Sequence, residues 1–234
     1  MSTKIFCDTA ELNIIKKFNK KKLVKGFTTN PSLMRQAGAK NYKTYSKKIL
    51  EICKNKPVSL EVFADEYSEM IDQAMKINNW AKNVYVKIPV TNSKGQFMGR
   101  LINELNSKNV KLNITAVYNA KQTEKILKKL NKKTKVIISI FAGRAGDAGK
   151  DPLPEFKKSI KISKKYKNVE ILWASVREPY NYTQARQIGC NIITVPPKII
   201  EKIENFGKTF DTLTKETVKT FLVDSRKSNF KIIS

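Results

Sequence analysis

Histidine is absent from the 234-residue chain. Its absence excludes Ser-His-Asp and Cys-His catalysis, histidine-ligated metals and acid–base chemistry by histidine. If the protein is an enzyme, its proton transfers must use Asp, Glu, Lys, Tyr or bound water.

Cysteine is scarce, with only Cys7, Cys53 and Cys190. An odd number of widely spaced cysteines makes neither a disulfide framework nor a CxxC metal site, so we interpret them as reduced core residues. No window approaches the roughly 18 apolar residues that a membrane span requires. The N-terminus lacks the apolar stretch of a secretory signal. We therefore expect a cytoplasmic protein with no membrane partner.

Acidic residues are also few, with 20 Asp and Glu against 46 Lys and Arg and a net charge of +26. Such a charge suggests nucleic acid, another polyanion or phosphorylated substrates. Only six of the basic residues are Arg, and the lysines form dispersed clusters such as KKFNKKK (16–22). Lys is typical of solvated helix faces, whereas Arg is preferred for bidentate recognition. We expect no nucleic-acid partner, and keep a non-catalytic barrel that binds a polyanion as the remote alternative.

Eight short, apolar, β-branched runs alternate with segments whose apolar spacing is near 3.6 residues. Asp8-Thr9, Asn30-Pro31-Ser32 and Asp151-Pro152 provide caps or a proline at helix entries. The runs are 4–8, 24–29, 57–62, 84–89, 110–115, 136–141, 169–175 and 191–196, and the helical segments include 11–18, 45–53, 69–77, 96–105, 122–130 and 154–166.

This alternation predicts a parallel sheet with helical crossovers. Eight units in a chain of this length favour a single (β/α)8 TIM barrel, with an open doubly wound sheet as the alternative. We predict one domain over residues 1–234, in which 209–234 form an extra C-terminal helix or tail.

Polar side chains stand at the carboxyl end of nearly every predicted strand. In a TIM barrel the chemistry lies at that end, so these residues are the candidate site. They are Asp8, Thr28, Thr29, Asn30, Glu61, Lys87, Asn113, Thr115, Phe141 with Arg144 beyond it, Ser175 with Arg177, and Thr194.

Lys87 is flanked by Val86 and Ile88, so in a strand it points to the opposite face from both. We expect that face to be the barrel interior, where an amine is costly unless it is paired or loses its proton. Such a lysine is the usual nucleophile for a carbonyl carbon. The alternative is a structural salt bridge between Lys87 and Glu61.

Arg144 and Arg177 lie just past the sixth and seventh strands, and Arg beside the hydroxyl of Ser175 would make an anion site. This pattern suggests a phosphorylated substrate. As alternatives, the two arginines could cap loops through carbonyl contacts, Asp8 and Asn30 could only cap helices, and the Thr115 and Ser175 hydroxyls could bond to backbone.

Seven segments resemble, in order, the active-site segments of the class I transaldolases, in particular the short microbial branch that also contains fructose-6-phosphate aldolase. The resemblance extends over roughly residues 4–205. The segments are KIFCDTAEL, GFTTNPSL, which is similar to the family signature TTNPS, SLEV, VYVKIPV, LNITAVY, IFAGR and WASVRE.

The resemblance implies that Lys87 forms a Schiff base with a ketose phosphate and that Asp8 takes the C4-hydroxyl proton during cleavage. It implies that Glu61 and Thr115 hold the water that relays protons. Asn30 and Asn113 would bind the dihydroxyacetone moiety, and Arg144, Ser175 and Arg177 the phosphate. Thr29 and Phe141 would also bind substrate. No metal and no organic cofactor is implied.

Glu61 and Phe141 are of the transaldolase kind, because aldolase members tend to carry Gln and Tyr there. The resemblance therefore implies transfer of a dihydroxyacetone unit between sugar phosphates, as in the pentose phosphate pathway. A fructose-6-phosphate aldolase or a specialised sugar-phosphate aldolase is the alternative, because the loops KIPVTNSKGQFMG and GRAGDAGKDPLPEF depart from the family pattern. Relatives form pentamers or decamers, which implies a homo-oligomer.

Overall fold

The computed structural model describes residues 2–228 and 232. The chain divides into two compact units, Met1–Ile200 and Glu201–Ser234. No helix among the described residues is long and apolar enough to cross a membrane.

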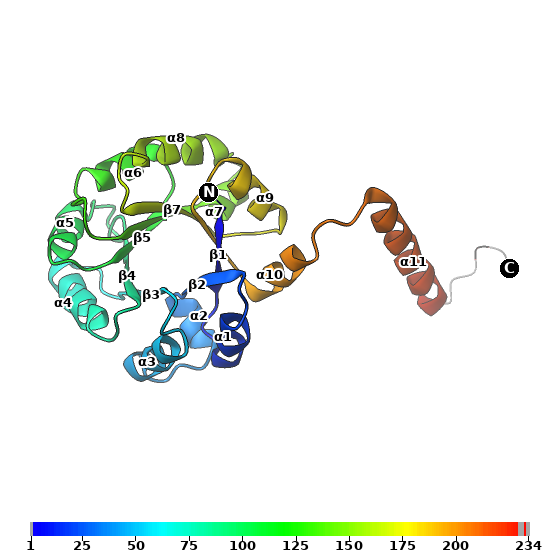
Figure 1. Cartoon of the computed structure of the whole chain (residues 1–234), viewed down its shortest axis with the longest axis horizontal. Coiled ribbons are helices and arrows are strands. Elements are labelled where there is room, and N and C mark those ends of the chain that lie inside the picture. Colours follow the sequence, from blue (N-terminus) through cyan, green and yellow to red (C-terminus); the bar gives the residue numbers. More distant parts are fainter. Residues whose placement is uncertain (1, 229–231, 233–234) are drawn as a thin grey trace. The chain divides into compact units, whose positions relative to one another are not determined.

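The first unit is a closed barrel of eight parallel strands in sequence order, surrounded by helices (Figure 1). The prediction of a (β/α)8 barrel is confirmed, and closure between β1 and β8 excludes the open sheet. The strands are β1 Lys4–Asp8, β2 Val24–Thr28, β3 Val58–Glu61, β4 Val84–Pro89, β5 Leu112–Val117, β6 Val136–Phe141, β7 Val169–Ala174 and β8 Ile192–Val195.

The helices of the barrel include the six that periodicity predicts and several shorter ones that it does not. They are α1 Leu12–Asn19, α2 Pro31–Gln36, α3 Tyr42–Ile52, α4 Tyr67–Asn78, α5 Gly99–Ser107, α6 Ala120–Leu127, α7 Ala142–Asp147, α8 Leu153–Ser163, α9 Tyr180–Gln187 and α10 Pro197–Glu204. Helices α2 and α7 have only six residues each, and α9 buries only Ala185, so these three carry little periodic signal.

The helix entry predicted at Asn30 is confirmed, although the helix that it caps is the short α2, which precedes the predicted segment 45–53. Two other predicted helix starts need correction. Asp8 does not cap α1, because that helix starts at Leu12 and the Asp8 carboxylate is bonded to Thr28 instead. Residues 96–98 of the segment 96–105 lie outside α5, since Phe97 makes an antiparallel bridge with Thr91.

An apolar layer fills the barrel interior. Side chains from β1, β4, β6, β7 and β8 pack in one buried cluster, and strands so far apart in the sheet can meet only inside it. Gly26 makes room for this layer, because a Cβ there would lie 2.6 Å from the Phe6 ring. The layer consists of Phe6, Tyr85, Ile137, Leu172, Ala174 and Ile192, with Phe141 against it.

The outer face of the strands packs against the helices. Trp173 is 1 % exposed, and its ring stacks on Phe156 of α8 with 4.5 Å between centroids. Cys7, Cys53 and Cys190 are buried and free, which confirms their interpretation as reduced core residues.

The second unit contains α11, Phe210–Ser228, which confirms a helix within the predicted segment 209–234. Residues 229–231 and 233–234 of that segment lie outside the described residues. No residue of α11 is buried, and several large apolar side chains on it are exposed, including Phe210, Leu213, Val218 and Phe221.

Candidate active site

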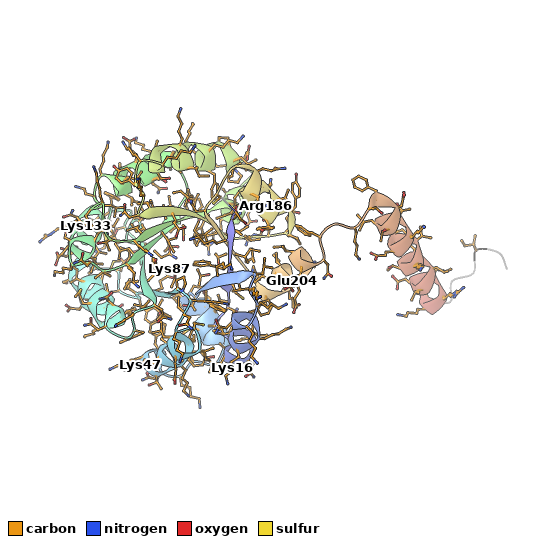
Figure 2. The ribbon with its side chains drawn as sticks, in the orientation of Figure 1. Lys16, Lys47, Lys87, Lys133, Arg186 and Glu204 are labelled. Carbon is orange, nitrogen blue, oxygen red and sulfur yellow. The ribbon has the colours of Figure 1, made fainter. Side chains whose placement is uncertain are left out.

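Lys87 lies on β4 with its side chain inside the ring of strands (Figure 2). Its Nζ is 3.0 Å from Oε2 of Glu61, the residue opposite it on β3, and donates to the carbonyl of Thr29 at 3.2 Å. The residue is only 9 % exposed, so these partners offset the cost of burying the ammonium group. They use two of its three donors and leave the third for another group.

The ion pair with Glu61 is the one that the structural alternative predicts. It does not exclude a chemical role, because a carboxylate at this distance is also in reach to accept a proton from the amine.

Asp8 ends β1 and is linked through Thr28 of β2 to Thr194 of β8. Thr28 donates to Asp8 Oδ1 at 2.6 Å, and the Thr28 and Thr194 hydroxyls are bonded to each other. Since the single hydroxyl hydrogen of Thr28 is used on Asp8, Thr194 must be the donor to Thr28. This chain orients the carboxylate.

Burial raises the pKa of Asp8 above its ordinary value. The hydrogen bond from Thr28 and the nearby charge of Lys87 oppose this shift, and the charge of Glu61 adds to it. Asp8 is therefore a stronger base than an exposed aspartate, as proton abstraction from a hydroxyl requires.

Asn113 lies opposite Lys87 on β5 and is held on both sides of its amide. Its Nδ2 donates to Ser59 Oγ at 2.9 Å, and Ser139 donates to its Oδ1 at 2.6 Å. Sequence reasoning missed Ser59 and Ser139. Period-2 alternation could have found them, because Ser59 and Ser139 stand two residues before Glu61 and Phe141 and so share their inward face.

Thr115 is buried at the end of β5, and its hydroxyl has no hydrogen-bond partner within the described part of the chain. The alternative of a strand-end hydroxyl bonded to backbone is therefore wrong for Thr115. An unpaired buried hydroxyl costs about 1–3 kcal/mol, and a site that accepts water or substrate would recover that cost.

Asn30 and Thr29 follow β2. The side-chain oxygen of Asn30 accepts a hydrogen bond from Leu33 N at 2.9 Å, which confirms the helix-cap interpretation for this residue. The side-chain nitrogen of Asn30 takes no part in this cap. Thr29 offers Lys87 its carbonyl, while its hydroxyl donates to the Ser59 carbonyl at 2.9 Å.

Ser175 brings the loops after β6 and β7 together. It has φ 62°, and its Oγ accepts from the backbone N–H of Arg144 at 3.2 Å. A Cβ on Gly143 would lie 1.8 Å from the Ser175 carbonyl oxygen, so only glycine permits this approach. The interpretation of Ser175 as a hydroxyl bonded to backbone is confirmed.

Arg144 and Arg177 stand beside this junction and are exposed. Arg177 pairs with Asp147 of α7 through Nε at 3.1 Å and through Nη2, rather than with a loop carbonyl. The hydrogen bonds from Arg177 lower the pKa of Asp147. The Arg144 guanidinium lies 5.7 Å from the centre of the Phe141 ring, which in turn packs 5.9 Å from Tyr118. The pairing of Asp147 could not be predicted from its local sequence, because its partner Arg177 lies 30 residues further along the chain.

The chain is similar to known proteins over almost its whole length. The family model described as Transaldolase/Fructose-6-phosphate aldolase matches residues 5–232. A relative from Nitrosopumilus maritimus, named as a probable transaldolase, is 36% identical and covers 96% of this chain and 95% of its own. Another of the same name, from Dehalococcoides mccartyi, is 34% identical and covers 94% and 97%.

Solved structures show the same fold at low identity. Thiamine phosphate pyrophosphorylase from Pyrococcus furiosus is 12% identical, has a TM-score of 0.57, and covers 82% of this chain and 85% of its own. That likeness concerns the barrel alone, whereas the family model and the relatives extend over almost the whole sequence. The chain belongs to the transaldolase/fructose-6-phosphate aldolase family.

Proposed function

We propose that the protein is a transaldolase that moves a dihydroxyacetone unit from fructose 6-phosphate or sedoheptulose 7-phosphate to an aldose phosphate through a Schiff base on Lys87. The observation that carries the proposal is the buried Lys87 amine, 3.0 Å from Glu61, with the charge of Asp8 close enough to interact. The relatives named as probable transaldolases support it.

In the proposed reaction the neutral Lys87 amine attacks the C2 carbonyl of the ketose phosphate. Protonation of the carbinolamine hydroxyl releases water and leaves a protonated imine. Asp8 then takes the proton of the C4 hydroxyl, the C3–C4 bond breaks, and its electron pair moves into the protonated imine to form a neutral enamine. The fragment that begins at C4 leaves as an aldose phosphate, and Asp8 keeps the proton. The enamine attacks the acceptor aldehyde, Asp8 returns its proton to the new hydroxyl, and water releases the product ketose.

Glu61 and Thr115 would hold the water that relays protons while the carbinolamine forms and loses water. The unpartnered Thr115 hydroxyl supports this role, and so does the distance from Glu61 to Lys87. Thr29, Asn30 and Asn113 would bind the dihydroxyacetone end, with Asn113 oriented by its two serine partners.

Arg144, Ser175 and Arg177 would bind the phosphate. Arg144 is steered by the Phe141 ring, and Arg177 is held by Asp147. In this proposal the phosphate competes with Asp147 for Arg177, so Asp147→Asn should lower the KM for ketose phosphate.

A fructose-6-phosphate aldolase activity is the second candidate, because the family model describes both activities. Turnover of fructose 6-phosphate with and without erythrose 4-phosphate separates them. We expect faster turnover with the acceptor, and release of free dihydroxyacetone as the main product would favour the aldolase.

Borohydride reduction in the presence of fructose 6-phosphate, followed by peptide mass mapping, tests the mechanism. We expect one reduced adduct on Lys87, and none there in Lys87→Ala. Adducts scattered over surface lysines, or no adduct, would overturn the proposal.

We further propose that the enzyme works in the cytoplasm, in the pentose phosphate pathway, as a homo-oligomer. The exposed apolar side chains of α11 support self-association. Light scattering after size exclusion should give a mass above 26.7 kDa, which is the mass of one chain, and Phe221→Lys should lower it.

A further inference from the structure

A cavity of about 1270 Å³ lies at the end of the barrel where the strands begin, which is the end opposite Lys87. We call it the basal cavity. Each strand contributes one of its first two residues or the residue just before it, so the cavity is centred on the barrel axis. These residues are Lys4, Lys25, Pro57, Asn83, Lys111, Lys135, Asn168 and Asn191.

Lysine is concentrated in this cavity. Eleven of its twenty-six lining residues are lysine, against forty in the 234 residues of the chain. The single carboxylate among the described lining residues is Glu170, and it is already paired with Lys4 at 2.6 Å. The other ten lysines face one cavity without an acidic partner in the described chain.

The like charges disfavour one another. Burial and then the charge of Lys135 lower the pKa of Lys111. Burial is also the main cause that lowers the pKa of Lys56, where Cys53 opposes the shift and the smaller effect of the Lys25 charge adds to it. An anion in the cavity would relieve this repulsion.

The basal cavity is closed toward the active site. Phe6 and Tyr85 line it and belong to the apolar layer of the barrel interior. Each stands two residues before an active-site residue, Asp8 or Lys87, on the same inward face. A ligand in the basal cavity is therefore separated from Lys87 by a layer of side chains.

We propose that the basal cavity binds an oligophosphate, a compact molecule that carries several phosphate groups. Lysine binds phosphate as a point charge, without the bidentate geometry of Arg, and no arginine lines the described cavity. A binding site for single-stranded nucleic acid would need exposed aromatic rings on which bases stack. Phe6 is only 2 % and Tyr85 only 8 % exposed, and the Tyr85 ring is occupied by Lys111 at 5.2 Å. The third aromatic residue that lines the described cavity, Tyr166, is half-buried, and Lys165 Nζ lies over its ring at 5.7 Å.

The test is calorimetric titration of the full chain with inorganic tripolyphosphate at about 0.1 M salt, where exposed charges more than about 10 Å apart are screened. The Lys25→Gln/Lys135→Gln variant neutralises two cavity lysines whose side chains have no hydrogen-bond or ion-pair partner among the described residues. Lys16→Gln/Lys47→Gln is the matched control, with two exposed lysines of α1 and α3 on the helical ring (Figure 2). Both variants change the net charge equally.

We expect one tripolyphosphate per chain, with affinity lowered about tenfold in the cavity variant, or 1.4 kcal/mol, and less than about twofold in the control. An equal loss in both variants would show binding to the general surface charge and overturn the proposal. Absence of saturable binding would overturn it as well. Tighter, cavity-dependent binding of oligothymidylate would replace the oligophosphate with nucleic acid.

Two further measurements keep the test decisive. The unfolding temperature of each variant shows that it is folded, and single Lys135→Gln replaces the double variant if that one unfolds. The proposal does not depend on the proposed transaldolase activity, because the same titration on Lys87→Ala should give unchanged tripolyphosphate affinity.

Discussion

The two ends of the barrel use the same residue type in opposite ways. At the carboxyl end, Lys87 is buried, paired with Glu61 and close enough to Asp8 to influence its charge. At the basal cavity, eleven lysines face one carboxylate. The comparison teaches that the abundance of lysine says little about Lys87, whose distinction lies in its burial and its acidic partners.

Both ends are built from the same strands by period-2 alternation. On β1 the inward residues are Lys4 at the basal cavity, Phe6 in the apolar layer and Asp8 in the active site. Just before and within β5, Lys111 at the basal cavity is followed by Asn113 at the carboxyl end. The apolar layer keeps the two charged regions apart.

Replacing one lysine at each end of the barrel gives the largest expected difference, which is a difference in transfer rate. Lys87→Met should lower the rate of dihydroxyacetone transfer by about 10⁴-fold, since no other amine replaces the nucleophile. Lys135→Met, at the basal cavity, should leave that rate within about twofold. Steady-state assays with fructose 6-phosphate and erythrose 4-phosphate measure both, and equal losses in the two variants would contradict the contrast.

Truncating a side chain of the apolar layer between the two ends should cause the largest loss of stability. Phe6 is 2 % exposed, and Phe6→Ala should lower the free energy of unfolding by about 3–5 kcal/mol because it leaves a cavity. Tyr180→Ala, at a 54 % exposed side chain of α9, should change it by less than about 0.5 kcal/mol. Urea titrations compare them. A small effect of Phe6→Ala would mean that the layer can collapse around the gap.

Replacing glycine by alanine tests how closely the loops pack at the carboxyl end of the barrel. Gly143→Ala should lower the free energy of unfolding by about 1–3 kcal/mol and raise the KM for ketose phosphate, since the new Cβ would force Ser175 away. Gly146→Ala is the matched control in the same helix, because its Cβ meets nothing within 4 Å. It should be neutral or slightly stabilising. Similar effects of both would show that the approach to Ser175 is not what requires glycine.

Asp8→Asn should give the smallest change in stability, with a definite pH dependence. Burial raises the folded-state pKa of Asp8, so its stabilising contribution is complete below the unfolded value of about 3.9 and is lost as pH rises through the raised value. The asparagine side chain of the variant is neutral at both pH values. The variant should therefore unfold at a higher temperature than the native chain near pH 8, with this advantage gone near pH 3.5, while transfer activity is lost.

Thermal scans at both pH values measure this difference. Asp72→Asn, on an exposed face of α4, is the control and should change the unfolding temperature little. A native chain more stable than Asp8→Asn at pH 8 would show that Lys87 and Thr28 outweigh the burial of the carboxylate.

Local sequence patterns predicted the positions of the strands and of most candidate site residues. Alternation around Lys87 predicts its inward direction, and the Asn30-Pro31 pair predicts a helix entry. The short helices α7 and α9 did not follow, because α7 has only six residues and α9 buries only Ala185, which leaves no apolar stripe to detect. The pairing of Arg177 with Asp147 did not follow either, because it depends on how two loops meet.

The sequence by itself determined an eight-unit parallel barrel, the absence of histidine chemistry and a lysine facing inward on the fourth strand, because period and composition are local properties. Only the tertiary structure decided that Glu61 pairs with Lys87, that Thr115 keeps an unpartnered hydroxyl, and that eleven lysines surround one basal cavity. Closing the barrel brings side chains distant in sequence to one axis, and their burial and charge then depend on neighbours that no single segment contains.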